Sequence, residues 1–230
     1  MRLYIPAIIA VLSISVIARG NAQGSFQNLN FASAAIPQGT PNGSFVPVVE
    51  ALPGWSAYFG SSQQNSLLYN NLSTGSVEVA LLDQNSPVGG VIPGNQYTVV
   101  LQAGLNGVNG ASTASIAQTG LIPSGSRSII FTAAPPTGPG WSVMLGGQNI
   151  PVVPESQQGS YVEYIGDISA FAGQTDELRF TADFSANKLG GMVLDNIQFS
   201  PNLVPEPSVW SLILCGTAFF GLTRKKGVRD

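Results

Sequence analysis

The chain has 230 residues, no histidine and a single cysteine, Cys215. These absences exclude Ser-His-Asp and Cys-His nucleophilic sites, and zinc sites built from imidazole or thiolate ligands. A disulfide within the chain is excluded too, so the fold must depend on core burial or on hard-ion binding. Cys215 lies in an apolar C-terminal run, where we interpret it as a small apolar residue; lipidation is the alternative.

Charged side chains are also scarce, at 9% of the residues. Between Gln23 and Leu203, ten acidic residues stand against the three basic residues Arg127, Arg179 and Lys188, a net charge of −7. Such a surface repels phosphate backbones, so we expect no nucleic-acid partner. This stretch of about 180 residues is long enough for one domain with a sizeable core.

The N-terminus predicts export. Met1-Arg2 precedes an apolar run, Leu3 to Ile17, and Gly20-Asn21-Ala22 places small residues at a cleavage site. We therefore predict a signal peptide over residues 1–22, although Arg19 leaves the exact cleavage bond open. An uncleaved N-terminal anchor is the alternative.

The C-terminus contains an uncharged apolar run, residues 209–223. At ~1.5 Å per residue this helix would be about 22 Å long, shorter than the ~30 Å hydrocarbon core of a bilayer. Spanning then requires local thinning or snorkelling of flanking basic side chains. We expect a linker over 200–208, a transmembrane helix over 209–223 and a basic cytoplasmic tail over 224–230.

These C-terminal parts resemble the PEP-CTERM sorting signal of exported bacterial proteins: the tripeptide Pro205-Glu206-Pro207, the apolar run, and the cluster Arg224-Lys225-Lys226. The resemblance implies recognition by a membrane-embedded exosortase and delivery to the cell envelope or extracellular polysaccharide matrix. Glu206 would then be a recognition element on a stiff, extended backbone and not a catalytic acid. A plain membrane anchor behind a proline-rich linker is the alternative.

Residues 23–199 predict an all-β domain. Ser76–Leu81 and Tyr97–Gln102 alternate at period two, glycine- and proline-rich breakers separate the runs, and Gly146-Gly147 indicates a hairpin turn. A single helical turn is expected near Ile168–Ala172. About nine or ten short strands predict an antiparallel β-sandwich. Further predicted strands are Ala114–Gln118, Ser128–Thr132, Trp141–Leu145, Asn149–Val153, Tyr161–Ile165, Glu177–Asp183 and Met192–Phe199.

The end of this domain carries a second resemblance. The segments Asp167–Thr175, Glu177–Phe180 and Val193–Phe199 resemble the closing strands of jelly-roll domains of the galactose-binding-like type. The resemblance implies a jelly-roll β-sandwich. It bears on architecture more than on function.

Two charged residues stand out in these strands. Alternation places Arg179 opposite the apolar face of its strand, where we predict an outward side chain paired across strands with an acid. The alternative is a ligand-binding role. Asp195 is expected to share a face with Val193 and Ile197 and to be a hydrogen-bonded structural acid that ties a loop. Calcium binding by Asp195 is the alternative, although no Asp-x-Asp-x-Asp run accompanies it.

A sugar-binding site needs exposed aromatic rings beside polar side chains. Trp55 and Tyr58, in a loop-like context, are the candidate glycan-binding residues. Trp141, which opens a predicted strand after Gly138-Pro139-Gly140, is a further aromatic residue considered for this role. The alternative is that these rings fill the ends of the sandwich core.

No pair of carboxylates is placed for catalysis by the sequence, so we predict no enzyme and no catalytic residues. The function expected first is a non-catalytic exported protein of the envelope or polysaccharide matrix, with a structural or adhesive role. The alternative is a carbohydrate-binding module with a defined glycan site.

Overall fold

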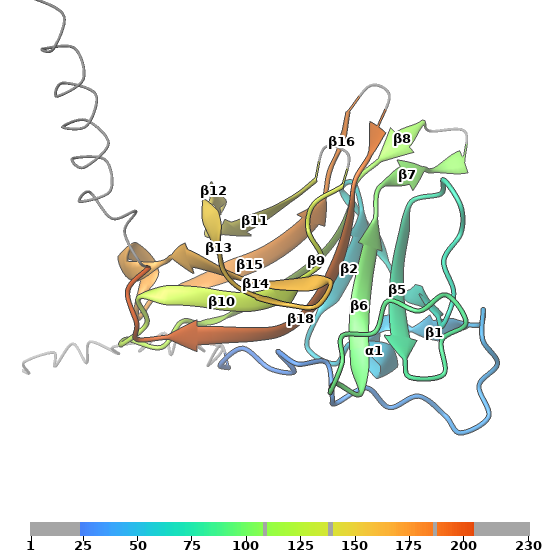
Figure 1. The fold of residues 1–230 in the computed structure, drawn as a ribbon, viewed down its shortest axis with the longest axis horizontal. Coiled ribbons are helices and arrows are strands. Elements are labelled where there is room, and N and C mark those ends of the chain that lie inside the picture. Colours follow the sequence, from blue (N-terminus) through green and yellow to red (C-terminus); the bar gives the residue numbers. More distant parts are fainter. Residues whose placement is uncertain (1–23, 108–109, 138–139, 186–187, 205–230) are drawn as a thin grey trace, which may run out of the picture.

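A computed structural model of the protein describes residues 24–107, 110–137, 140–185 and 188–204. The predicted signal peptide, sorting motif, Cys215 and tail helix lie outside these residues. Within the described ranges, no helix is both long enough and apolar enough to cross a bilayer. The described chain folds into two mainly antiparallel sheets that pack face to face as a β-sandwich, as predicted (Figure 1).

The larger sheet has eight strands, all paired antiparallel except for the parallel pair β4–β5. In spatial order they are β1 (Phe45–Pro47), β4 (Ser66–Tyr69), β5 (Glu78–Asp83), β6 (Tyr97–Gln102), β18 (Gly191–Ser200), β10 (Ser128–Ala133), β14 (Tyr161–Asp167) and β13 (Val152–Gln158).

The smaller sheet has six antiparallel strands. In spatial order they are β12 (Gln148–Asn149), β11 (Trp141–Leu145), β15 (Thr175–Ala182), β9 (Ala114–Leu121), β2 (Ser56–Phe59) and β3 (Ser62–Gln64). Two short ribbons and two helical turns complete the described elements: β7 (Gly104–Leu105) with β8 (Ala111–Ser112), β16 (Phe184–Ser185) with β17 (Lys188–Leu189), α1 (Val48–Ala51) and the 3-10 turn η2 (Ser169–Phe171).

The main core lies between the sheets, because period-two alternation turns one face of each strand inward. Its centre is aromatic: Phe131 of the larger sheet meets Phe180 of the smaller one edge-on, with ring centroids 5.2 Å apart. Both side chains are fully buried. Trp141 and Tyr164 continue the cluster against Phe131, at 5.6 and 5.7 Å. This aromatic packing fixes how the two sheets face each other.

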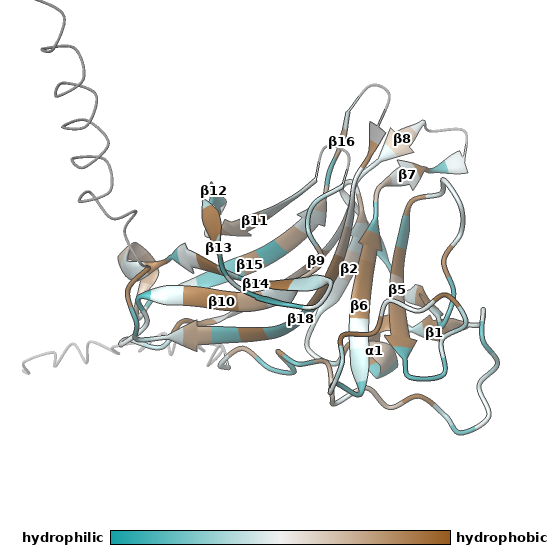
Figure 2. Ribbon diagram, in the orientation of Figure 1, coloured by the Kyte–Doolittle hydropathy of each residue, from teal (hydrophilic) through white to brown (hydrophobic). Residues whose placement is uncertain are grey.

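A second, smaller core covers the other face of β5 and β6. Leu82 and Val100 are buried there, and Val91 and Val193 pack against them. Figure 2 shows the hydrophobic residues along β5 and β6 in brown. These strands are therefore buried on both faces, and the loop between them, residues 84–96, is structural cover for the larger sheet.

Most predicted strands are confirmed, with β6 and β11 matching their predicted bounds. The Gly146-Gly147 turn joins β11 to β12 with positive φ at both glycines, and η2 is the predicted helical turn. The run Asn149–Val153 is not one strand: β12 ends at Asn149, and β13 begins at Val152 in the other sheet. Pro151 lies between them and has no N–H for a ladder.

Candidate functional site

The outward face of the smaller sheet carries two rows of mostly uncharged polar side chains across the strands. Cross-strand pairing places Arg179 level with Met144 and Ala117, and Thr181 level with Ser115 and Ser142. We call this surface the Arg179 face. Its members are Asn149, Met144, Arg179, Ala117 and Ser56 in one row, Ser142, Thr181, Ser115, Tyr58 and Gln63 in the next, and Glu177 with Thr119 beyond them.

Three contacts hold the guanidinium of Arg179 in place on this face. Its Nε donates to Glu177 Oε1 at 2.8 Å, and one terminal nitrogen donates to Ser115 Oγ at 2.9 Å. Its Cζ lies 4.5 Å from the ring centroid of Tyr58, a cation–π contact. The predicted outward orientation is confirmed. The acid, however, is Glu177 on the same strand, two residues earlier, and not a residue across the sheet.

Tyr58 is the aromatic ring of the Arg179 face and is half-buried. Its strand, β2, pairs with β9 so that Tyr58 lies level with Ser115, and Gln63 of β3 lies level on its other side. The ring thus has the bonded guanidinium of Arg179 and the carboxamide of Gln63 beside it, whereas Ser115 is buried and its hydroxyl accepts from Arg179. An aromatic ring with convergent hydrogen-bonding groups is the composition that sugar sites use.

A shallow depression of about 130 Å³ continues the Arg179 face beyond Thr119. It forms where β2 leaves β9: the last pair is Ser56 with Ala117, and the N-terminal segment fills the gap. Gln118 fixes that segment, because its carboxamide both accepts from the Gln27 N–H and donates to the Gln27 carbonyl oxygen. The lining is Gly24, Ser25, Gln27, Gly54, Gln118 and Thr119, all uncharged.

Trp55 is not part of this surface, and its prediction as an exposed glycan-binding ring is wrong. The side chain is 4% exposed and packs between Phe31 and Phe180, with centroid distances of 5.9 and 6.4 Å. Its Nε1 donates to the Asn28 carbonyl oxygen at 3.2 Å. The preceding turn directs the ring into the core, which is the alternative stated for it. Trp141 likewise packs on Phe131 in the core cluster.

Asp195 is the tied structural acid that the sequence predicts. It has no exposed surface, and its carboxylate accepts from Asn95 Nδ2 at 2.7 Å and from the Asn196 N–H at 2.7 Å. Burial raises the pKa of Asp195 to about 7, although the bonds from Asn196 and Asn95 oppose the change. Asn95 belongs to the 84–96 loop, so Asp195 ties this loop to β18. Its role as a calcium ligand stays a prediction; within the described residues, no three potential metal-ligating side chains lie together.

The predicted shared face of Asp195 and Ile197 is wrong. Ile197 is buried in the main core, whereas Asp195 lies beneath the 84–96 loop. A β-bulge separates them: Asn196 has φ of 54°, and the pairing with β10 shifts between Thr132–Asp195 and Ile130–Gln198. The extra residue in β18 reverses the alternation beyond it.

A further polar cluster, missed by the sequence reasoning, joins β4 to β5. The Tyr69 hydroxyl donates to Asp83 at 2.6 Å and Asn70 Nδ2 donates to it at 2.7 Å. Burial opposes ionisation of Asp83, but these hydrogen bonds outweigh it and hold the pKa of the carboxyl below its ordinary value. Every hydrogen-bond partner here is another side chain or backbone group of the same cluster. We therefore interpret the cluster as a structural link between β4 and β5.

No protein-family model and no curated protein matches the chain. Three solved structures show remote likenesses. The enzymatically active domain of tailspike protein 4 of bacteriophage CBA120 has 15% identity and a TM-score of 0.37, over 73% of this chain and 21% of that one. TmCBM61 in complex with β-1,4-galactotriose has 12% identity and a TM-score of 0.39, over 77% and 98%.

The third is a glycoside hydrolase family 43 arabinoxylan arabinofuranohydrolase from Bacillus subtilis in complex with cellotetraose. It has 14% identity and a TM-score of 0.28, over 70% of this chain and 50% of that one. This chain therefore spans about a fifth of the tailspike domain and half of the hydrolase. At such TM-scores, we draw the function from the geometry of the Arg179 face alone.

Proposed function

We propose that this chain is an exported, non-catalytic protein whose β-sandwich binds a neutral polysaccharide through the Arg179 face. The observation that carries the proposal is the braced Tyr58 ring, held by Arg179 within two rows of mainly uncharged side chains, most of which are polar. A pyranose has an apolar face that packs on an aromatic ring and hydroxyls that bond to amides, hydroxyls and guanidinium groups.

The shape of the surface suits a polymer better than a small molecule. The second row runs across five adjacent strands, from Ser142 on β11 to Gln63 on β3. At a strand spacing of ~4.8 Å, this row is about 19 Å long. Ser115 and Ala117, in the middle of the face, are only 2% and 3% exposed, so a chain of several sugar rings lying across the strands would contact mainly Tyr58, Arg179 and the polar side chains on either side of them.

Electrostatics favour a neutral glycan over an acidic one. The charge of Arg179 is balanced by Glu177 at 2.8 Å, and the predicted exported domain as a whole carries a net charge of −7. A uronate-rich polymer would meet long-range repulsion without an uncompensated cation to receive it. We therefore expect binding that changes little with salt.

The same geometry supports a non-catalytic role for this face. Glycosidase chemistry needs two carboxyl groups about 5–9 Å apart across the bond to be cleaved. Among the residues that define the Arg179 face, Glu177 is the single carboxylate, and it is bonded to Arg179. Its neighbour Asp176 alternates to the opposite face of β15.

The export and sorting part of the proposal depends on the chain ends. The PEP-CTERM resemblance of Pro205-Glu206-Pro207 and Arg224-Lys225-Lys226 supports delivery to the envelope or the polysaccharide matrix, where a neutral glycan ligand is available. Mass spectrometry of the mature protein from native cells tests it. A C-terminus at or just after Pro207 supports exosortase processing; an intact Asp230 in a stably membrane-bound protein would overturn it.

The jelly-roll type of the sandwich is also part of this proposal, supported by the two-sheet architecture.

Affinity electrophoresis in gels containing neutral or uronate-rich polysaccharides tests the binding site. We expect retardation by at least one neutral polymer and about a tenfold weaker interaction for Tyr58→Ala, equivalent to ~1.4 kcal/mol. Phe45→Ala is the matched control, because Phe45 is a 74% exposed ring on β1 of the other sheet. Equal retardation of Tyr58→Ala and the parent, or preference for the acidic polymers, would contradict the proposal.

A further inference from the structure

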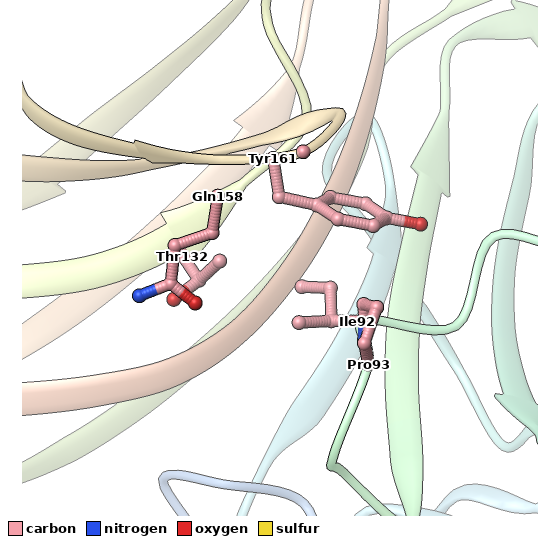
Figure 3. Close-up of a pocket in the computed structure, with 6 residues that line it drawn as sticks. Ile92, Pro93, Thr132, Gln158 and Tyr161 are labelled. Atoms are coloured by element: carbon pink, nitrogen blue, oxygen red, sulfur yellow. The ribbon is translucent and has the colours of Figure 1, made fainter.

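A second hollow lies on the opposite layer, on the outward face of the larger sheet. It has a volume of about 250 Å³ and is bounded by the 84–96 loop on one side and the β13–β14 hairpin on the other. Figure 3 shows the Tyr161 ring facing Ile92 and Pro93, with Gln158 and Thr132 at the remaining side. Thr132 alternates with the core residue Phe131 along β10, so it points away from the sandwich core. We call this hollow the Tyr161 pocket.

The loop wall of the Tyr161 pocket is held by hydrogen bonds from beneath. The Ile92 N–H donates to Thr98 Oγ1 at 3.0 Å, and Asn95 Nδ2 donates to Asp195 Oδ2 at 2.7 Å. The Tyr161 hydroxyl donates to the Val91 carbonyl oxygen at 3.4 Å and connects the two walls. Binding therefore requires little ordering of the protein, which favours affinity for a small ligand.

The lining selects an uncharged ligand. Its walls are mainly apolar, with the Thr132 hydroxyl and the Gln158 carboxamide as the side-chain hydrogen-bonding groups beside Tyr161. Burial raises the pKa of the Tyr161 phenol, so the ring is neutral near pH 7. Glu163 lies level with Thr132 on β14. This acidic residue beside the pocket opposes an anion.

The size selects a ligand of about one ring. Pockets for drug-sized molecules are about 300–1,000 Å³, and the Tyr161 pocket is smaller than that range. An aromatic wall, two hydrogen-bonding groups and no anion-binding group fit a molecule with an apolar ring face and a rim of hydroxyls.

We propose that the Tyr161 pocket binds a single neutral pyranose unit, the terminal sugar of a glycan, with a ring face against Tyr161. The sugar hydroxyls bond to the Gln158 carboxamide and the Thr132 hydroxyl, and Ile92 with Pro93 covers the other side of the ring. This site is separate from the Arg179 face, and its occupation does not depend on the function proposed there.

One consequence does rest on the proposed function. With a chain-binding surface on one sheet and an end-binding pocket on the other, a single molecule contacts two glycans on opposite sides of the sandwich. Linked sites of this kind raise the overall avidity for a polymer network without tight binding at either site.

Saturation-transfer NMR of the full chain in mild detergent, titrated with methyl glycosides of galactose, glucose and mannose, tests the pocket. We expect saturation transfer to at least one glycoside, with affinity lowered roughly tenfold or more (~1.4 kcal/mol) by Tyr161→Ala. Tyr161→Phe keeps the ring and is expected to remain within about threefold, since the lost hydroxyl bond is long. Thermal unfolding of each variant confirms that it is folded.

The matched control is Phe45→Ala, which removes a 74% exposed aromatic ring of the same sheet that belongs to neither proposed site, and should leave monosaccharide binding unchanged. The pocket proposal is overturned if no glycoside shows transfer, if Tyr58→Ala abolishes it while Tyr161→Ala does not, or if tetramethylammonium competes as well as any sugar. In contrast, failure of the Arg179-face proposal would appear as unchanged polysaccharide retardation in Tyr58→Ala. The two proposals can therefore fail independently.

Discussion

The replacement Asp195→Asn gives a direct test of how the 84–96 loop is held. Asp195 has no exposed surface, and its pKa is raised from the ordinary 3.8 to about 7, because burial disfavours the charged carboxylate. The hydrogen bonds from Asn196, Asn95 and Thr98 recover only part of that cost. The folded chain therefore holds a proton on Asp195 over a pH range in which the unfolded chain has released it.

The sign of the effect follows from proton linkage. Where the folded state binds more protons than the unfolded state, the free energy of unfolding falls as the pH rises. For Asp195 this window runs from about pH 4 to about pH 7, so its stabilising effect is present below the window and lost above it. At ~1.36 kcal/mol per pH unit, the full change is about 4 kcal/mol. Glu78 and Asp183 also have raised pKa values from burial and add to the slope in the same direction.

Urea unfolding of the parent and Asp195→Asn at several pH values between 4 and 8 measures the effect. The new amide does not titrate, so the variant should gain about 4 kcal/mol relative to the parent across this range, whatever their difference at pH 4. Asp167→Asn is the control: hydrogen bonds from Ser169 lower the pKa of Asp167 from its ordinary 3.8, so its contribution weakens mainly below about pH 4, and its profile over most of this range should run parallel to that of the parent. Parallel pH profiles for the parent and Asp195→Asn would refute a buried, proton-binding Asp195.

Two further predictions concern stability. Phe180→Ala removes a fully buried ring that packs on Phe131 and Trp55. Urea titrations should show a free energy of unfolding lower by about 3–5 kcal/mol. A loss below ~1 kcal/mol would contradict the aromatic core. Gly54→Ala should destabilise the protein by roughly 1–3 kcal/mol, because φ is 86° and the new Cβ would approach Gln118 to 3.1 Å. Gly125→Ala is the control, since a Cβ there would meet open space, and the substitution should be neutral or slightly stabilising. Equal midpoints of thermal unfolding for the two variants would contradict this prediction.

The sheet architecture was predictable because its signal is local. Alternation and turn residues are sufficient to place β6, β11 and most of β15, and alternation alone gives the outward side of Arg179. What surrounds Arg179 depends on register between strands far apart in the sequence. Tyr58 reaches it only because β2 pairs with β9 and β9 with β15.

Trp55 shows where local context misleads. The Pro53-Gly54 turn before it is typical of an exposed loop, and nothing nearby in the sequence indicates that the ring turns inward. Its burial is decided by Phe31 and Phe180, which come from segments that the sequence does not connect to it. The bulge at Asn196 explains the wrong prediction for Ile197 in the same way, because one extra residue in β18 reverses the side of the sheet on which each later side chain lies.

The 84–96 loop shows most clearly that contacts between distant segments override local sequence patterns. Pro93-Gly94-Asn95 predicts a turn, and turns are ordinarily solvated connections. Here Asn95 instead bonds to a carboxylate on β18, Val91 covers the second core, and Ile92 forms a pocket wall. A loop fixed at three such points loses little freedom when a ligand enters. Since the same Asn95–Asp195 bond supports the wall of the Tyr161 pocket, we expect ionisation of Asp195 to affect loop stability before it affects the sheets beneath.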